Sequence, residues 1–207
     1  MPYSETQIIA RISTVLQDTG TAIWGTGEIG QGIADAVREV ANYRPNIGLA
    51  TVTTSEGTKD ISISGVSNLL HGYDEESIEA VEFREDKEPK HFRNFKIHGS
   101  RLMMDISFEP DASENVRLYV RQPHVVVSGT ATATNTLDSE LERLLIDLVA
   151  ARLAMNKGRS YINKVNVGGT RPFGEIRLWG QDKLILTLRE LKALKKPSIQ
   201  EEWPKVV

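Results

Sequence analysis

The periodicity of the apolar residues changes twice along the chain, and this change constrains the fold more than any other feature. Residues before Pro45 and after Asn135 repeat their apolar side chains every three or four positions, the spacing of an amphipathic helix. The residues between these limits alternate apolar and polar side chains, as half-buried strands do. Because helices and strands do not alternate, a parallel sheet with crossover helices is excluded. The pattern predicts an α+β protein, a four-helix domain with an inserted antiparallel β domain.

The helical domain is predicted in two parts. Ser4 and Gln7 form a capping box before the first helix, and Thr26 is the expected N-cap of the second. A third helix is predicted to start after Thr136 and to end at Gly158, and the last to run from near Pro172 to Lys196. The expected boundaries are 1–46 and 136–196 for the helical domain, 47–135 for the β insertion and 197–207 for a C-terminal arm.

Two hairpins are predicted within the β insertion. The first joins residues 49–54 to 59–63 through a turn at Glu56-Gly57. The second turns at Gly99-Ser100, a two-residue loop that suits type II′ geometry. A later strand begins near Val116 and breaks at Pro123, which cannot donate a ladder hydrogen bond.

The sequence Gly25-x-Gly27-x-x-Gly30 matches a dinucleotide-binding fingerprint. That use requires a preceding strand and an acidic residue about 20 positions later, and residues 46–49 contain no acid. We therefore favour a helix entry, with Gly27 and Gly30 in tight helix contact, and expect no cofactor. Trp24 is predicted to be an apolar plug where two helices join, and the helix after it is expected to be central to the bundle.

Composition excludes several function classes. The 207 residues include no cysteine, so disulfides, thiolate catalysis and cysteine-based zinc sites are ruled out. No hydrolase, phosphate-loop or zinc-protease motif occurs, and the four histidines have no metal-ligand spacing. We therefore expect no enzymatic activity, no catalytic residues and no metal. No apolar run is long enough to span a bilayer and the first residues lack a secretion signal, so we expect synthesis in the cytosol and no membrane partner.

The charge is unevenly distributed although the net charge is only −3. The predicted β insertion is acidic and the last third of the chain is mildly basic. Basic residues there are candidates to face DNA or an acidic partner, with an ordinary charged surface as the alternative. These candidates are Lys157, Arg159, Lys164 and Arg171.

Several blocks of sequence resemble the head–tail adaptor (connector) proteins of tailed bacteriophages, in particular the short-tailed type whose helical domain carries a β insertion. The blocks are spread over most of the chain. They are Ile23-Trp24 with the helix that ends at Pro45, Asp60–Ser62, Phe92–Leu102, Val116–His124, and Thr136-Leu137 before Glu140–Leu145.

The resemblance implies a structural virion protein at the head–tail junction. Such proteins form a ring, usually of twelve copies, below the portal protein; the ring extends the channel for genomic DNA, without sequence specificity, and offers a platform for tail or nozzle proteins. Their C-terminal segments commonly reach into the portal. The implied docking residues in this chain are Ile199, Trp203, Pro204, Val206 and Val207.

Two alternatives stay open. Another phage neck or tail-completion protein would share these structural signatures. A nucleotide-binding enzyme that uses Gly25–Gly30 belongs to a different class and has weaker support from the sequence.

Overall fold

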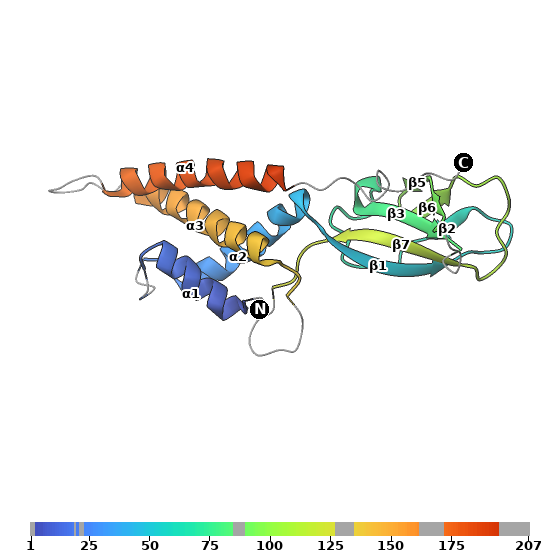
Figure 1. Cartoon of the computed structure of the whole chain (residues 1–207), viewed down its shortest axis with the longest axis horizontal. Coiled ribbons are helices and arrows are strands. Elements are labelled where there is room, and N and C mark those ends of the chain that lie inside the picture. The colour runs from blue at the N-terminus through green and yellow to red at the C-terminus, as the bar shows by residue number, and fades with distance from the viewer. Residues whose placement is uncertain are drawn as a thin grey trace. The chain divides into compact units, whose positions relative to one another are not determined.

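The computed structural model describes residues 3–18, 20, 23–84, 90–126, 135–161 and 172–194, which form two compact units (Figure 1). The helical unit contains the residues up to Arg44 and a second segment that starts at His124 and includes α3 and α4. The β unit contains Pro45–Pro123. It is therefore a contiguous insertion in a discontinuous helical unit. The insertion ends at Pro123, whereas the sequence pattern places its end at residue 135.

The helical unit consists of four helices. They are α1 (Glu5–Val15), α2 (Thr26–Tyr43), α3 (Ser139–Tyr161) and α4 (Pro172–Ala193). Together with the antiparallel sheets of the β unit, they confirm the predicted α+β class. In the part of the chain that the structure describes, no helix is long and apolar enough to cross a bilayer.

The helix starts follow capping chemistry. Both hydrogen bonds of the predicted capping box are present, between Ser4 and Gln7. The predicted N-cap Thr26 is wrong by one position, because Gly25 has the extended backbone of the cap. Asp138, not Thr136, caps α3: its Oδ1 accepts hydrogen bonds from the backbone N–H groups of residues 140 and 141, at 3.1 and 2.8 Å.

The core of the helical unit is centred on α3, which contacts each of the other three helices (Figure 1). α2 also contacts the other three helices, but α3 packs far more extensively, so the central position that was predicted for α2 belongs to α3. The predicted end of α3 at Gly158 is also wrong, because the helix continues to Tyr161 and Gly158 is buried. Buried core side chains of α3 are Leu141, Leu144, Leu145, Leu148, Val149 and Leu153.

The β unit contains two sheets. One has the strand order β1-β7-β3-β4 and the other β2-β6-β5. The strands are β1 (Asn46–Thr53), β2 (Asp60–Ser62), β3 (Ile78–Phe83), β4 (Phe92–Arg93), β5 (Phe95–His98), β6 (Arg101–Met104) and β7 (Asn115–Gln122), with a 3-10 turn, η1 (Glu75–Ser77), before β3.

One predicted hairpin is confirmed and the other is wrong. β5 and β6 pair around Gly99-Ser100, and Gly99 has φ 58°, the left-handed region that a type II′ turn needs at its first central residue. The turn at Glu56-Gly57, by contrast, joins strands of different sheets, because β1 pairs with β7 and β2 pairs with β6. As predicted, β7 ends immediately before Pro123.

The two sheets share one apolar core. Alternate residues of β3 and β7 point toward the other sheet and pack against side chains of β2 and β6. The core residues are Ile61, Ile63, Ile78, Val81, Phe83, Leu102, Met104, Ile106, Val116, Leu118 and Val120. The opposite face of the larger sheet carries charged and aromatic side chains of β3 and β7 and the exposed aliphatic side chains of Ile47 and Leu49 in β1.

Candidate assembly surface

The loop before α2 is anchored by a buried carboxylate and a buried indole. Oδ2 of Asp18 accepts hydrogen bonds from the backbone N–H groups of Ile23 and Trp24, both at 2.9 Å. The indole of Trp24 is 2% exposed, and its Nε1 donates to the carbonyl oxygen of Leu153 in α3 at 3.4 Å. This confirms Trp24 as the apolar plug that fixes the entry of α2 against α3.

The glycines of the fingerprint do not mediate helix packing. A Cβ added at Gly25, Gly27 or Gly30 would meet no atom within 4 Å, so the predicted tight contact is wrong. The close approaches are made by two other glycines. A Cβ at Gly32 would lie 3.1 Å from Val149, and one at Gly180 would lie 2.7 Å from the carbonyl oxygen of Ala151.

The structural context of a dinucleotide site is also missing around these glycines. Ile23 and Trp24 form a bend rather than a strand, and every strand pair among the described residues is antiparallel. A dinucleotide fingerprint works at the junction of a parallel strand and a helix. Searched over the same residues, no group of three or more His, Asp or Glu side chains could hold a metal ion.

A histidine ties together the two points where the chain leaves and re-enters the helical unit. His124 Nε2 lies 2.7 Å from the carbonyl oxygen of Arg44, and Nδ1 lies 3.1 Å from the hydroxyl of Thr136. Because the carbonyl can only accept, we assign the hydrogen to Nε2, so that Nδ1 accepts from Thr136. The Arg44 guanidinium pairs with Asp138 at 2.9 Å. Burial lowers the pKa of His124 below its ordinary value, which favours this neutral form.

The outer face of the larger sheet carries a buried ionic network. Glu82 of β3 is 0% exposed and accepts a hydrogen bond from the hydroxyl of Tyr119 at 2.7 Å. Lys90 and Arg117 lie 3.8 and 3.7 Å from the same carboxylate oxygen, Oε2. Lys90 also donates to Tyr119 at 3.0 Å, and this hydrogen bond is the main reason that the pKa of Lys90 is raised.

This network holds β3 against β7. Tyr119 and Arg117 are consecutive outward residues of β7, and Glu82 lies directly opposite Arg117 in the sheet register. The register shift between Ile78 and Ala80 leaves Glu79 on the same face, where it pairs with Arg121. This register shift is a β-bulge. Its role is structural, because it brings the second carboxylate to a second guanidinium.

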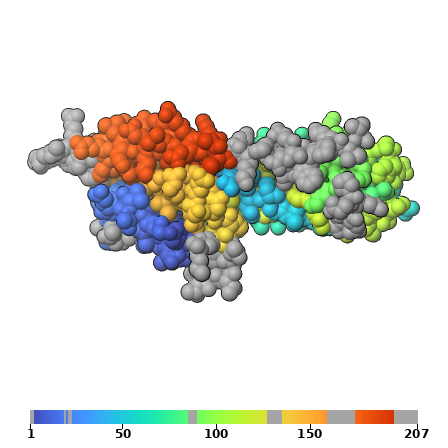
Figure 2. Space-filling view, viewed as in Figure 1, coloured from blue at the N-terminus to red at the C-terminus, as the bar shows by residue number. Residues whose placement is uncertain are grey.

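The outer face of α4 exposes four large apolar side chains. Leu178 and Trp179 are 58% and 41% exposed, and Ile185 and Leu186, two turns later, are 44% and 57% exposed. Leu178 and Ile185 thus lie outside the core, although their spacing alone would suit a buried helix face. The buried face of α4 contains Gly180, Thr187 and Leu191 instead. In Figure 2 the orange surface of α4 lies open along most of its length.

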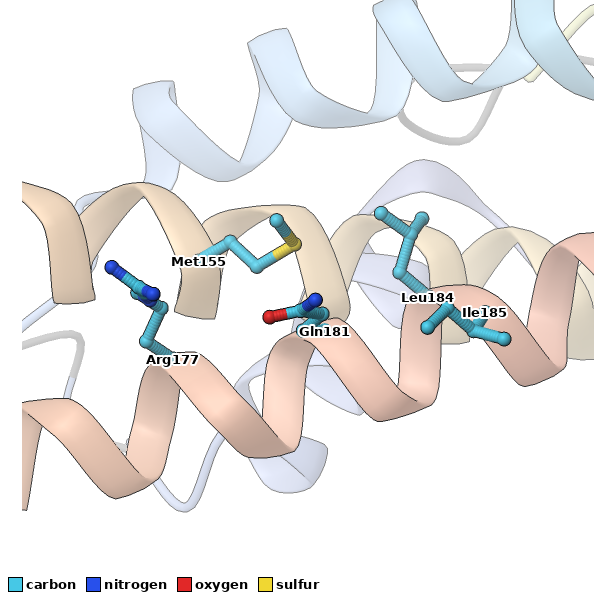
Figure 3. Close-up of a pocket in the computed structure, with 5 residues that line it drawn as sticks. All are labelled: Met155, Arg177, Gln181, Leu184 and Ile185. Atoms are coloured by element: carbon cyan, nitrogen blue, oxygen red, sulfur yellow. The ribbon is translucent and has the colours of Figure 1, made fainter.

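A groove runs along one side of this apolar face. It has a volume of ≈ 380 Å³ and is lined by Met155 of α3 and by four residues of α4. Figure 3 shows these α4 side chains on successive turns: Arg177, Gln181, Leu184 and Ile185. The apolar face of α4 is therefore continuous with a concave surface, a combination that is typical of protein–protein contacts.

Of the basic candidates, Lys157 is described and lies in α3. Its Nζ is 3.7 Å from a carboxylate oxygen of Glu28 in α2, and the side chain is only 20% exposed. It therefore contributes to packing between α2 and α3. Arg159 belongs to α3, but its side chain lies outside the described residues, as do Lys164, Arg171 and the C-terminal docking residues Ile199, Trp203, Pro204, Val206 and Val207.

Sequence reasoning missed both the ionic network and the exposed face of α4. A signal for the first was present in the alternation of Arg117, Tyr119 and Arg121 on one face of a strand, with Glu79 and Glu82 nearby in sequence. A signal for the second was the recurrence of two adjacent apolar pairs seven residues apart.

Compared with known proteins, the chain matches no protein-family profile and no curated protein sequence.

Proposed function

We propose that this protein is a structural, non-enzymatic component of a tailed-phage virion. In this proposal it is a head–tail adaptor that forms a homo-oligomeric ring, of about a dozen copies in the proteins it resembles, beneath the portal. One observation carries the proposal: a contiguous antiparallel β unit, Pro45–Pro123, interrupts a helical unit between its second and third helices. This is the arrangement implied by the adaptor resemblance.

The parts of the chain then have distinct mechanical roles. The helical units pack side by side in the ring and leave a channel for genomic DNA, and the β units meet tail or nozzle proteins. The segment with Ile199, Trp203, Pro204, Val206 and Val207 docks on the portal. A few such apolar residues, once buried, supply most of the energy of an interface. The hydrogen bond between His124 and the Arg44 carbonyl supports this division, because it holds together the two residues of the helical unit that flank the insertion.

Imaging of the purified protein with and without portal rings tests the proposal. We expect a cyclic ring of this protein on the portal, which is lost when residues 198–207 are deleted while the far-UV circular dichroism spectrum is unchanged. Trp203→Ala should weaken portal binding, and Lys205→Ala is the matched control in the same segment. If the truncated protein binds portal rings normally, the docking role of the C-terminal segment is wrong.

Two other outcomes would replace the proposal. Binding to isolated tails but not to portal rings would identify another neck or tail-completion protein. Tight binding of a nicotinamide or flavin nucleotide by calorimetry, lost in Gly27→Ala, would identify the enzyme alternative.

A further inference from the structure

The exposed face of α4 is complementary to itself. We infer that two copies of the chain associate through this face in an antiparallel, two-fold contact. The α4 stripe is the set of outward residues that would make this contact: Glu175, Leu178, Trp179, Asp182, Ile185, Leu186 and Arg189. This inference does not depend on the proposed function, because it rests on the order and exposure of these residues alone.

The α4 stripe is symmetric about Asp182. One apolar pair, Leu178 and Trp179, precedes Asp182 by four and three residues, and the other, Ile185 and Leu186, follows by three and four. Glu175 and Arg189 lie seven residues to either side. Since residues seven apart lie on nearly the same side of a helix, all of these positions share one face.

An antiparallel second copy matches this order at every flanking position. With the two-fold axis at Asp182, Leu178 faces Leu186 of the second copy, and Trp179 faces its Ile185. Glu175 of each copy then faces Arg189 of the other, which gives two ion pairs. A parallel arrangement would instead place Glu175 against Glu175 and Arg189 against Arg189, so charge favours the antiparallel contact.

The charges at the ends of the α4 stripe are free to make these pairs. Glu175 and Arg189 are exposed, and neither forms an ion pair in the part of the chain that the structure describes. Trp179 is already oriented: the ammonium of Lys183 lies 5.9 Å from its ring centroid, and Lys183 is held by Asp147 at 2.9 Å. A preoriented aromatic side chain loses less conformational entropy when it binds.

Asp182 opposes the contact and limits its affinity. On the two-fold axis it faces Asp182 of the second copy, and like charges at close range are unfavourable. Because a two-fold contact closes at two copies, the resulting dimer is distinct from a cyclic ring, which needs two different surfaces on each subunit. The dimer is therefore a separate assembly state of the free protein.

Sedimentation equilibrium of the full chain measures the dimer. We expect Leu186→Ser to raise the dimer dissociation constant by about tenfold or more, since each dimer loses two contacts. Leu49→Ser is the matched control, because Leu49 is 64% exposed but lies in the β unit. Asp182→Asn should lower the dissociation constant. A wild-type chain that stays monomeric, or an equal effect of Leu186→Ser and Leu49→Ser, overturns the inference.

Charge reversal tests the antiparallel orientation. Glu175→Arg and Arg189→Glu should each weaken self-association, whereas an equimolar mixture of the two variants should form heterodimers with both ion pairs restored. Arg38→Glu, a reversal on the exposed face of α2, is the control for net charge. Weakening by each variant without recovery in the mixture excludes the antiparallel contact, and an unchanged spectrum confirms that each variant is folded. Because no portal is present, this result is independent of whether the protein is an adaptor.

Discussion

The two units bury carboxylates in different ways. In the helical unit, Asp18 and Glu142 accept hydrogen bonds from backbone N–H groups, those of Ile23 and Trp24 for the first and that of Tyr3 for the second. In the β unit, Glu79 and Glu82 instead meet guanidinium, ammonium and phenol groups of neighbouring strands.

This difference follows from what each architecture leaves unsatisfied. Helices satisfy their own backbone internally, so the N–H groups that need an acceptor are found in the connecting segments. In a sheet the ladder satisfies the backbone, and a carboxylate on its face must find side-chain partners across strands. Buried acids therefore fix chain connections in the helical unit and strand register in the β unit.

Removing the indole of Trp24, which the loop after Asp18 holds in place, should cause the largest loss of stability. Trp24→Ala is expected to lower the free energy of unfolding of the helical unit by about 3–5 kcal/mol, because it deletes a fully buried aromatic side chain. Urea titration followed at 222 nm measures this. Trp179→Ala, at a position that is 41% exposed, should cost clearly less than Trp24→Ala, because much less apolar surface is removed from the interior. Similar losses for both variants would contradict the assignment of Trp24 as a core residue.

Breaking the cross-strand network around Glu82 should cause an intermediate loss of stability that is confined to the β unit. Tyr119→Phe removes the hydroxyl that donates to Glu82, and a hydrogen bond to a charged group is worth about 1.5–3 kcal/mol. Hydrogen exchange of the β3 and β7 amides measures the loss. Tyr73→Phe is the control, because the exposed Tyr73 hydroxyl donates to the backbone carbonyl of Ser64 rather than to a carboxylate. Equal protection in the two variants would show that the network does not hold the register.

Mild acid should lower the stability of the helical unit more than that of the β unit, by a smaller amount than the two substitutions above. His124 is the buried histidine of the four, and burial lowers its pKa in the folded state. The unfolded chain therefore binds the proton more tightly, so its contribution to stability is complete above about pH 6.5 and is lost as pH falls toward the folded pKa.

His124→Gln should flatten the pH dependence of helical-unit stability between about pH 7.5 and pH 5.5. The measurement is urea titration at 222 nm at each pH. His71→Gln, at an exposed position in the β unit, should leave the dependence unchanged. A parallel decline in wild type and His124→Gln would place the titrating group elsewhere.

The sequence was sufficient for the fold class and for features set by near neighbours. The Ser4–Gln7 capping box, the turn at Gly99-Ser100 and the end of β7 at Pro123 all depend on a few adjacent residues, and all are present. Strand pairing depends on distant residues. The alternation in residues 49–63 predicts two strands correctly but cannot show that β1 pairs with β7 rather than with β2.

Contacts between helices were equally hard to predict. Gly27, Gly30, Gly32 and Gly180 all lie in helices, yet only Gly32 and Gly180 face another helix closely. Which glycine does so depends on how α2 and α4 are rotated against α3, and the spacing of apolar residues gives this rotation only coarsely. On α4 both faces carry apolar residues, so Leu178 and Ile185 could not be distinguished from core positions.

The insertion at Arg44 and His124 determines an order of folding during synthesis. The β unit is contiguous, so it can fold as soon as Pro123 has left the ribosome, whereas α1 and α2 must wait for α3 before their apolar faces are covered. Pairing of Asn46 with Gln122 then brings the two ends of the insertion together. The segment of 79 residues between Arg44 and His124 is thereby already closed when α3 packs on α2. The contact between the two helices therefore does not have to offset the entropy cost of closing this segment.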